Sequence, residues 1–175
     1  MAKNSSQIRI ISGTHGGREI DTPKTKATHP MGERERAAIF NSIRAEIYGR
    51  RILDAFAGSG AIGIEALSLG ASRVDFMEKH PKAIKTIQRN LEKLQLKDRT
   101  SIVRAPDGDY SIIFADPPYD NPQYDVVASL IAHLVPGGFF VLSHPEVPNP
   151  PQFAYLELIS DKKYAAARIK IYRKK

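Results

Sequence analysis

The chain of 175 residues contains no cysteine, which excludes a disulfide-stapled scaffold and a cysteine-ligated zinc site. No run approaches the roughly 20 apolar residues of a membrane span, and the first twenty residues lack the apolar core of a secretion signal. There is no internal repeat, low-complexity block or interdomain linker. With 42% hydrophobic residues, we expect a single domain over residues 1–175, with a buried core and a cytoplasmic location.

Positive charge is concentrated at the two ends of the chain, whose net charge is +7. Residues 1–51 hold ten Lys and Arg against five Asp and Glu, and residues 160–175 hold seven against one. The middle, residues 52–159, holds nine against thirteen. A basic surface that serves only solubility is one interpretation. The segregation favours the other, in which the basic ends contact nucleic-acid phosphates.

The most informative motif is Asp116-Pro117-Pro118-Tyr119, which directly follows the apolar run 112–115. Each proline fixes its φ and lacks an N–H, so nearby carbonyls have no adjacent donor. Asp116 precedes a proline and is therefore biased toward an extended conformation. The motif predicts fixed acceptors beside an aromatic face, an arrangement suited to holding the exocyclic amino group of a nucleobase. A plain proline turn that closes a strand is the alternative.

A second motif, Gly58-Ser59-Gly60-Ala61-Ile62-Gly63, follows an expected buried strand at 51–56. The G-x-G-x-x-G pattern alone is a weak signal, but a strand before it and a helix after it are typical of a nucleotide-binding loop. The next expected strand, 73–78, ends in Glu78, whose carboxylate would accept hydrogen bonds from two ribose hydroxyls. The sequence therefore predicts an adenosine site in its first half and an amine site after the later strand.

Alternating strands and helices predict an α/β fold, a Rossmann-like, doubly wound, mostly parallel sheet. We expect its strands at 51–56, 73–78, 101–104, 111–115 and 139–143, and its helices at 60–69, 81–95 and 122–134. A C-terminal antiparallel pair is expected at 156–160 and 165–172. A small N-terminal hairpin (8–12 and 18–22) and a helix (32–48) precede the sheet. Ligands of such sheets bind beyond the carboxyl ends of the strands, where both motifs fall.

The run from Asp54 to Leu67, together with the Asp-Pro-Pro-Tyr motif, resembles class I S-adenosylmethionine-dependent N-methyltransferases. Two N-terminal stretches, Ile8 to Gly13 and Arg34 to Asn41, are similar to signatures of the RsmD family of bacterial ribosomal RNA guanine-N2 methyltransferases. The likeness extends from residue 7 to residue 142. It implies methyl transfer from S-adenosylmethionine to the exocyclic N2 of a guanine in small-subunit ribosomal RNA. The implied partner is that RNA, within a small subunit or an assembly particle, and the enzyme is expected to be a monomer.

The resemblance also implies roles for individual residues. The expected catalytic residues are Asp116, Pro117, Pro118 and Tyr119. The expected cofactor contacts are Asp54, Phe56, Ala57, Gly58, Ser59, Gly60, Glu78, Lys79 and Ala105. The expected RNA contacts are Arg9, Arg18, His29, Arg34 and Arg36, all in an N-terminal extension (1–50) that precedes a catalytic core (51–175).

Simpler roles stay open for several of these residues. Asp54 could cap the turn that follows it, and Glu78 could be a surface acid. Arg34 and Arg36 could form an exposed helix face. His15 and His29 have no second ligand at metal spacing, so no metal is expected.

The expected chemistry needs few groups. The Asp116 carboxylate and the Pro117 carbonyl would accept the N–H groups of the amine and stabilise the positive charge that develops on its nitrogen. Tyr119 would stack on the purine. Positioning against the methyl donor supplies much of the catalysis, and a base in a paired setting would first be flipped out.

The chain departs from the family pattern at four places. His29-Pro30-Met31 replaces Arg-Pro-Thr, Ala37 replaces an acid, and Leu142-Ser143-His144 lacks the usual glutamate. The largest departure is the link 105–110, which is shorter than in the family and has no helix. At about 3.3 Å per residue it can cross the sheet only if nearly extended. We expect a shallow, open adenine pocket and a weakened affinity for the cofactor.

Three other functions stay open. Adenine-N6 methylation of DNA or RNA would use the same motif. A nicotinamide-dependent oxidoreductase fits the glycine loop and Glu78, but leaves the Asp-Pro-Pro-Tyr motif without a task. A catalytically weakened RNA-binding protein of ribosome assembly is the third, and the short link favours it.

Overall fold

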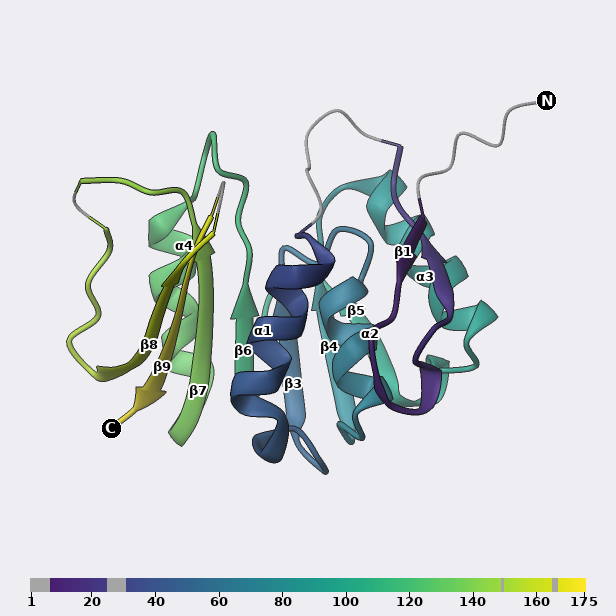
Figure 1. Cartoon of the computed structure of the whole chain (residues 1–175), viewed down its shortest axis with the longest axis horizontal. Coiled ribbons are helices and arrows are strands. Elements are labelled where there is room, and N and C mark those ends of the chain that lie inside the picture. Colours follow the sequence, from purple (N-terminus) through teal and green to yellow (C-terminus); the bar gives the residue numbers. More distant parts are fainter. Residues whose placement is uncertain (1–6, 25–30, 149, 165–166) are drawn as a thin grey trace.

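The computed structural model describes residues 7–24, 31–148, 150–164 and 167–175 (Figure 1). Its centre is a seven-stranded sheet with the order β5-β4-β3-β6-β7-β9-β8. Neighbours from β5 to β7 run parallel, whereas β9 is antiparallel to both β7 and β8. The predicted α/β sheet with a C-terminal antiparallel pair is confirmed. The strands are β3 (Arg51–Ala55), β4 (Arg73–Met77), β5 (Thr100–Val103), β6 (Tyr110–Ala115), β7 (Leu134–His144), β8 (Leu156–Lys163) and β9 (Arg168–Lys174).

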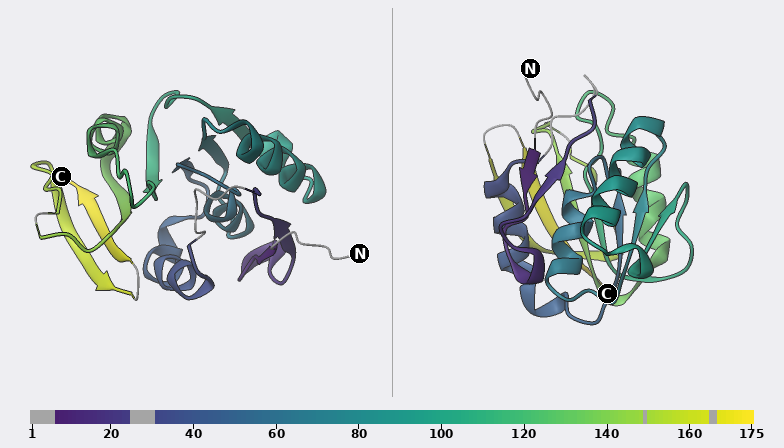
Figure 2. Two further views of the ribbon diagram at one scale, coloured as in Figure 1. Left: turned by 90° about the horizontal axis from the view of Figure 1, so that it is seen from above. Right: turned by 90° about the vertical axis from the view of Figure 1, so that its right-hand side faces the viewer.

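Helices cover both faces of this sheet (Figures 1 and 2). Apolar side chains alternate between the faces along each strand, as in Ile112, Ile113 and Phe114 of β6, so each face has its own buried cluster. One cluster takes in residues of α1 (Glu33–Ile43), α2 (Ala61–Ser68) and α3 (Pro81–Lys93), and the other those of α4 (Tyr124–Leu130).

The N-terminal hairpin, β1 (Gln7–Arg9) and β2 (Glu19–Asp21), is a separate two-stranded sheet that packs on α2. Glu65 of α2 is fully buried, and its carboxylate accepts hydrogen bonds from the backbone N–H groups of Ile11 and Ser12. Gly13 has a φ of +81°, and a Cβ there would lie 2.0 Å from the carbonyl oxygen of Ser68. Only glycine permits this approach, which explains the glycine at position 13, in the connection between β1 and β2.

Several boundaries differ from those expected. The helix expected at 32–48 ends at Ile43 and is continued by a 3-10 turn, Arg44–Glu46. The helix expected at 122–134 is α4 followed by a 3-10 turn, Ile131–His133. β7 begins at Leu134, before the Pro136-Gly137-Gly138 segment, because pairing with β6 starts there and shifts register around that segment. These differences move element ends and leave the order of the elements unchanged.

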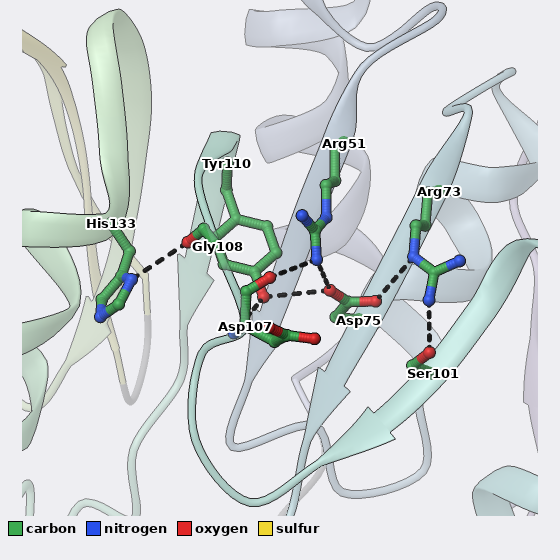
Figure 3. A network of polar contacts seen from close by, with 8 residues as sticks. All are labelled: Arg51, Arg73, Asp75, Ser101, Asp107, Gly108, Tyr110 and His133. Carbon is green, nitrogen blue, oxygen red and sulfur yellow. Dashed lines mark hydrogen bonds and ion pairs between the residues drawn. The ribbon is translucent and has the colours of Figure 1, made fainter.

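The short link between β5 and β6 forms neither helix nor strand over residues 104–109 (Figure 3). It is held by a polar network on the face of the sheet opposite α2. Asp75 of β4, 1% exposed, is ion-paired with Arg51 and Arg73 at 2.6 and 3.2 Å. Tyr110 donates its hydroxyl to Asp75 and accepts the N–H of Asp107, both at 3.0 Å. The link is therefore fastened by hydrogen bonds where a crossover helix would be fastened by apolar packing.

Candidate functional site

The sheet register brings both sequence motifs to the carboxyl ends of the parallel strands. β3 lies between β4 and β6, and Ala55 is in register with Met77 on one side and Ala115 on the other. Because the three strands are parallel, the segments that follow them leave the same edge. The glycine loop, Glu78 and Asp116 thus start from neighbouring points.

The glycines of the loop serve two different purposes. A Cβ on Gly63 would lie 2.3 Å from the Phe76 ring, and one on Gly60 would lie 3.3 Å from it, so both let α2 pack closely on β4. Gly58 differs, because the nearest atom to its Cβ position is the Phe56 carbonyl oxygen at 4.0 Å. The backbone at Gly58 therefore faces open space, as close approach of a ligand requires. Phe56 itself has a φ of 61°, which is rare for a non-glycine residue and marks a sharp turn.

Asp54 is the penultimate residue of β3, just before this loop, and is 1% exposed. Its Oδ2 accepts the backbone N–H of Gly63 at 2.9 Å, in the first turn of α2. Burial raises the pKa of Asp54 well above its usual range. The observed contact is the capping one, and it fixes the carboxyl directly beneath the loop.

Glu78 links the glycine loop to the segment that follows β4. Its Oε2 accepts the N–H of Gly58 at 2.9 Å, and its Oε1 accepts those of Lys79 and His80 at 2.8 Å each. The side chain is half-buried, so it is more than a solvated surface acid. Around it, Ala57 and Ser59 are buried, whereas Lys79 and Ala105 are exposed at the rim.

The Asp-Pro-Pro-Tyr segment follows β6 beside the end of β7. Burial raises the pKa of Asp116 from its ordinary value to about 6, and a hydrogen bond from Ser143 opposes this rise. Tyr119 is 36% exposed, and its hydroxyl oxygen lies 2.6 Å from Oγ of Ser143. Burial also raises the pKa of Tyr119 to about 12. Both contacts form together when Tyr119 donates its hydroxyl proton to Oγ of Ser143 and Ser143 donates its own proton to Asp116.

Ser143 is a residue whose role the sequence does not reveal. It is 1% exposed, on a strand that pairs with β6. In the sequence it stands out only because a serine occupies the place of an expected glutamate. Its contact with the motif comes from the parallel pairing of β6 and β7, which brings together residues 24 positions apart.

The residues expected to contact RNA divide into three groups. Arg9, Arg18 and Arg34 are exposed on or beside the hairpin, and Arg9 pairs with Glu33 at 2.9 Å. His29 lies outside the described residues. Arg36, expected to contact RNA, is instead buried.

Arg36 is 2% exposed and does not reach the surface. Its guanidinium donates to the carbonyl oxygens of Met31 and Arg9, at 2.8 and 2.9 Å. Burial lowers the pKa of Arg36. It therefore fastens the start of α1 to the hairpin, and a buried guanidinium with these partners is not placed to grip a phosphate.

Among the described residues, no helix combines the length and the apolar character needed to cross a membrane. The same residues also contain no group of three or more His, Asp or Glu side chains that could hold a metal ion.

Comparisons with known proteins give a consistent result. A family model described as "Conserved hypothetical protein 95" matches residues 8–173. The chain is 33% identical, over 184 aligned residues, to "Putative rRNA methyltransferase YlbH" of Bacillus subtilis, covering 96% of this chain and all of that protein. It is 32% identical to "Ribosomal RNA small subunit methyltransferase D" of Haemophilus influenzae, covering 69% of this chain and 61% of the relative.

A solved structure agrees with this result. The structure described as "Putative methyltransferase yhhF" from Escherichia coli matches with a TM-score of 0.87 and 25% sequence identity. The match covers 97% of this chain and 99% of that one. The likeness therefore includes the hairpin, the glycine loop and the C-terminal strands.

Proposed function

Because the chain belongs to the RsmD family, we propose that it transfers a methyl group from S-adenosylmethionine to the exocyclic N2 of a guanine in small-subunit ribosomal RNA. One observation carries the proposal. The open backbone at Gly58, beside the anchored carboxylate of Glu78, shares an edge of the sheet with the Asp-Pro-Pro-Tyr segment. A nucleoside site and an amine site thus lie side by side.

The glycine-loop side fits S-adenosylmethionine, since a Cβ at Gly58 would point into space that a ligand could fill. The loop from Phe56 to Gly60 would hold the cofactor from below, with Asp54 beneath it. Oε2 of Glu78, which accepts a single N–H, would also accept a ribose hydroxyl, and Lys79 and Ala105 would border the adenine. When bound, the cofactor supplies an electrophilic methyl group.

The Asp-Pro-Pro-Tyr side provides acceptors for the guanine amino group. The Asp116 carboxylate and the Pro117 carbonyl would accept its two N–H groups, which stabilises the positive charge that develops on nitrogen. The nitrogen gains a methyl group and then loses one proton, which Asp116 can take because its pKa is raised to about 6. Pro118 would keep the segment rigid.

Tyr119 would supply the stacking surface for the guanine. Its hydroxyl is fixed by Ser143 while its ring is partly exposed, so the orientation of the ring is set before a base arrives. Stacking of this kind contributes about 1–3 kcal/mol per base. The base would leave its own stack to reach this position.

The N-terminal extension would bind the RNA backbone. Arg9, Arg18 and Arg34 are exposed, and their charges would add salt-dependent affinity for phosphates. We also propose that the enzyme is a monomer that acts in the cytoplasm, on a small ribosomal subunit or an assembly particle.

The test is transfer of labelled methyl from S-adenosylmethionine to unmodified 16S ribosomal RNA, free and in small-subunit particles. Digestion of the RNA should yield N2-methylguanosine, and Asp116→Ala should abolish the label. N6-methyladenosine in the digest would overturn the guanine assignment in favour of adenine methylation. RNA and cofactor binding without transfer would point instead to a protein that assists assembly.

A further inference from the structure

An exposed tyrosine lies near the amino end of β3, whereas the candidate site lies at the carboxyl ends of the strands. Tyr48 is 82% exposed and stands between the 3-10 turn Arg44–Glu46 and the start of β3 at Arg51. Its ring lies over the backbone of Gly70, where a Cβ would be 2.6 Å from Cδ2 of the ring. The Cδ2 side of the ring thus lies against the chain, and most of the ring is exposed to solvent.

The ring forms one wall of an open hollow of about 510 Å³. Arg44 and Thr14 form other walls, and the floor is made by Gly13 and residues 68–70. The conformations of Gly13 and Gly70, with φ of +81° and +97°, let the backbone come this close to the ring and to α2. The hollow is open and not enclosed, so it would contact part of a ligand and leave the rest in solvent.

Among the residues that line the hollow, Arg44 is the one that carries a charge. Arg44 and Arg50 flank Tyr48 in the sequence and both are exposed. Among the ion pairs of the described residues, neither guanidinium takes part in one. An exposed aromatic ring that shares a hollow with the guanidinium of Arg44 is the chemistry that binds an unpaired nucleotide, with the base on the ring and the phosphate on the arginine.

We propose that this Tyr48 hollow binds an unpaired nucleotide of the RNA substrate, away from the base that is methylated. The inference rests on the proposed function. The five residues of β3 separate the hollow from the glycine loop, a distance of about 16 Å at 3.3 Å per residue. The hollow therefore increases the affinity for RNA and helps to position the RNA on the protein. It takes no part in methyl transfer itself.

The experiment measures the Kd for transcribed 16S ribosomal RNA by filter binding, with Tyr48→Ala, Tyr48→Phe and Tyr155→Ala. Tyr155 is 74% exposed and lies outside the hollow, so it is a matched control. Loss of one stacked base should weaken binding about tenfold in Tyr48→Ala. Tyr48→Phe keeps the ring and should bind like the wild type, as should Tyr155→Ala. A Tyr48→Ala protein that binds RNA as tightly as the wild type overturns the inference.

Four further readouts separate this inference from simpler explanations. The melting temperature and S-adenosylmethionine affinity of Tyr48→Ala should equal those of the wild type; a loss of either together with RNA binding would mean a folding defect and would overturn the inference. Arg44→Gln should lower the slope of log Kd against log salt by about one. The methylation rate at saturating RNA should be unchanged in Tyr48→Ala. A wild-type protein that binds RNA but transfers no methyl group would overturn the proposed function, while the binding series would still decide the role of the hollow.

Discussion

The two carboxylates of the candidate site, Glu78 and Asp116, differ in how far the chain satisfies them. Both follow strands adjacent to β3. Glu78 accepts three backbone N–H groups from its own and the neighbouring loop. Asp116 is followed by two prolines, which have no N–H to offer, and its pKa is raised to about 6. One end of the site is therefore formed in advance, and the other keeps acceptor capacity for a substrate.

The largest expected effect is the fall in methyl-transfer rate when Asp116 loses its acceptor capacity. Asp116→Asn keeps the shape of the side chain but replaces one carboxylate oxygen, an acceptor, with an NH₂ group, a donor. This NH₂ group would face the N–H donors of the guanine amine. The rate of methyl transfer should fall on the order of 100-fold or more. Cofactor affinity, measured by calorimetry, should not change, because Glu78 and the glycine loop are intact.

Asp120→Asn is the matched control, since Asp120 is exposed four residues further along the same segment. It should keep the wild-type rate. A substantial rate in Asp116→Asn would show that the Pro117 carbonyl and positioning suffice for methyl transfer. It would contradict the view that Asp116, unlike Glu78, is kept as an acceptor for the substrate.

The next effect tests the preformed end. Glu78→Gln replaces an acceptor oxygen by an NH₂ group that would face a backbone N–H, and leaving such a group unpaired costs about 1–3 kcal/mol. The KM for S-adenosylmethionine should rise on the order of tenfold, with little change in kcat at saturation. Glu92→Gln on the exposed face of α3 serves as the control. An unchanged KM would mean that Glu78 serves only the loop.

The third effect is the pH dependence of methyl transfer. With the pKa of Asp116 at about 6, activity should rise between pH 5 and 7 and reach half its plateau near pH 6. Stability should change in the opposite sense. A carboxyl whose pKa is raised on folding binds its proton more tightly in the folded state, so its contribution falls as pH rises from about 4 to about 6. The difference in unfolding free energy between wild type and Asp116→Asn, measured by urea titration across this range, should show that fall. A flat difference would contradict the burial of the carboxyl.

The sequence predicted the parts of this site that depend on local pattern. The glycine loop and the Asp-Pro-Pro-Tyr segment each directly follow an apolar strand, so their places at the sheet edge could be inferred from order alone. Contacts between segments that are far apart in the sequence could not be inferred in this way. The burial of Arg36 depends on the carbonyl of Arg9, 27 residues away, and the anchoring role of Glu65 depends on Ile11, 54 residues away. In the sequence these residues look like ordinary charges on helices.

Ser143 belongs to the same non-local class and gives the smallest expected effect. Ser143→Ala removes the hydroxyl that opposes the raised pKa of Asp116 and that fixes the Tyr119 hydroxyl. The midpoint of the pH profile should therefore move upward, and the rate at pH 7 should fall a few-fold. Ser42→Ala, on the exposed side of α1, should leave both unchanged. A lower rate with an unmoved midpoint would mean that Ser143 acts only through Tyr119, since the loss of a donor to Asp116 must raise that carboxyl's pKa.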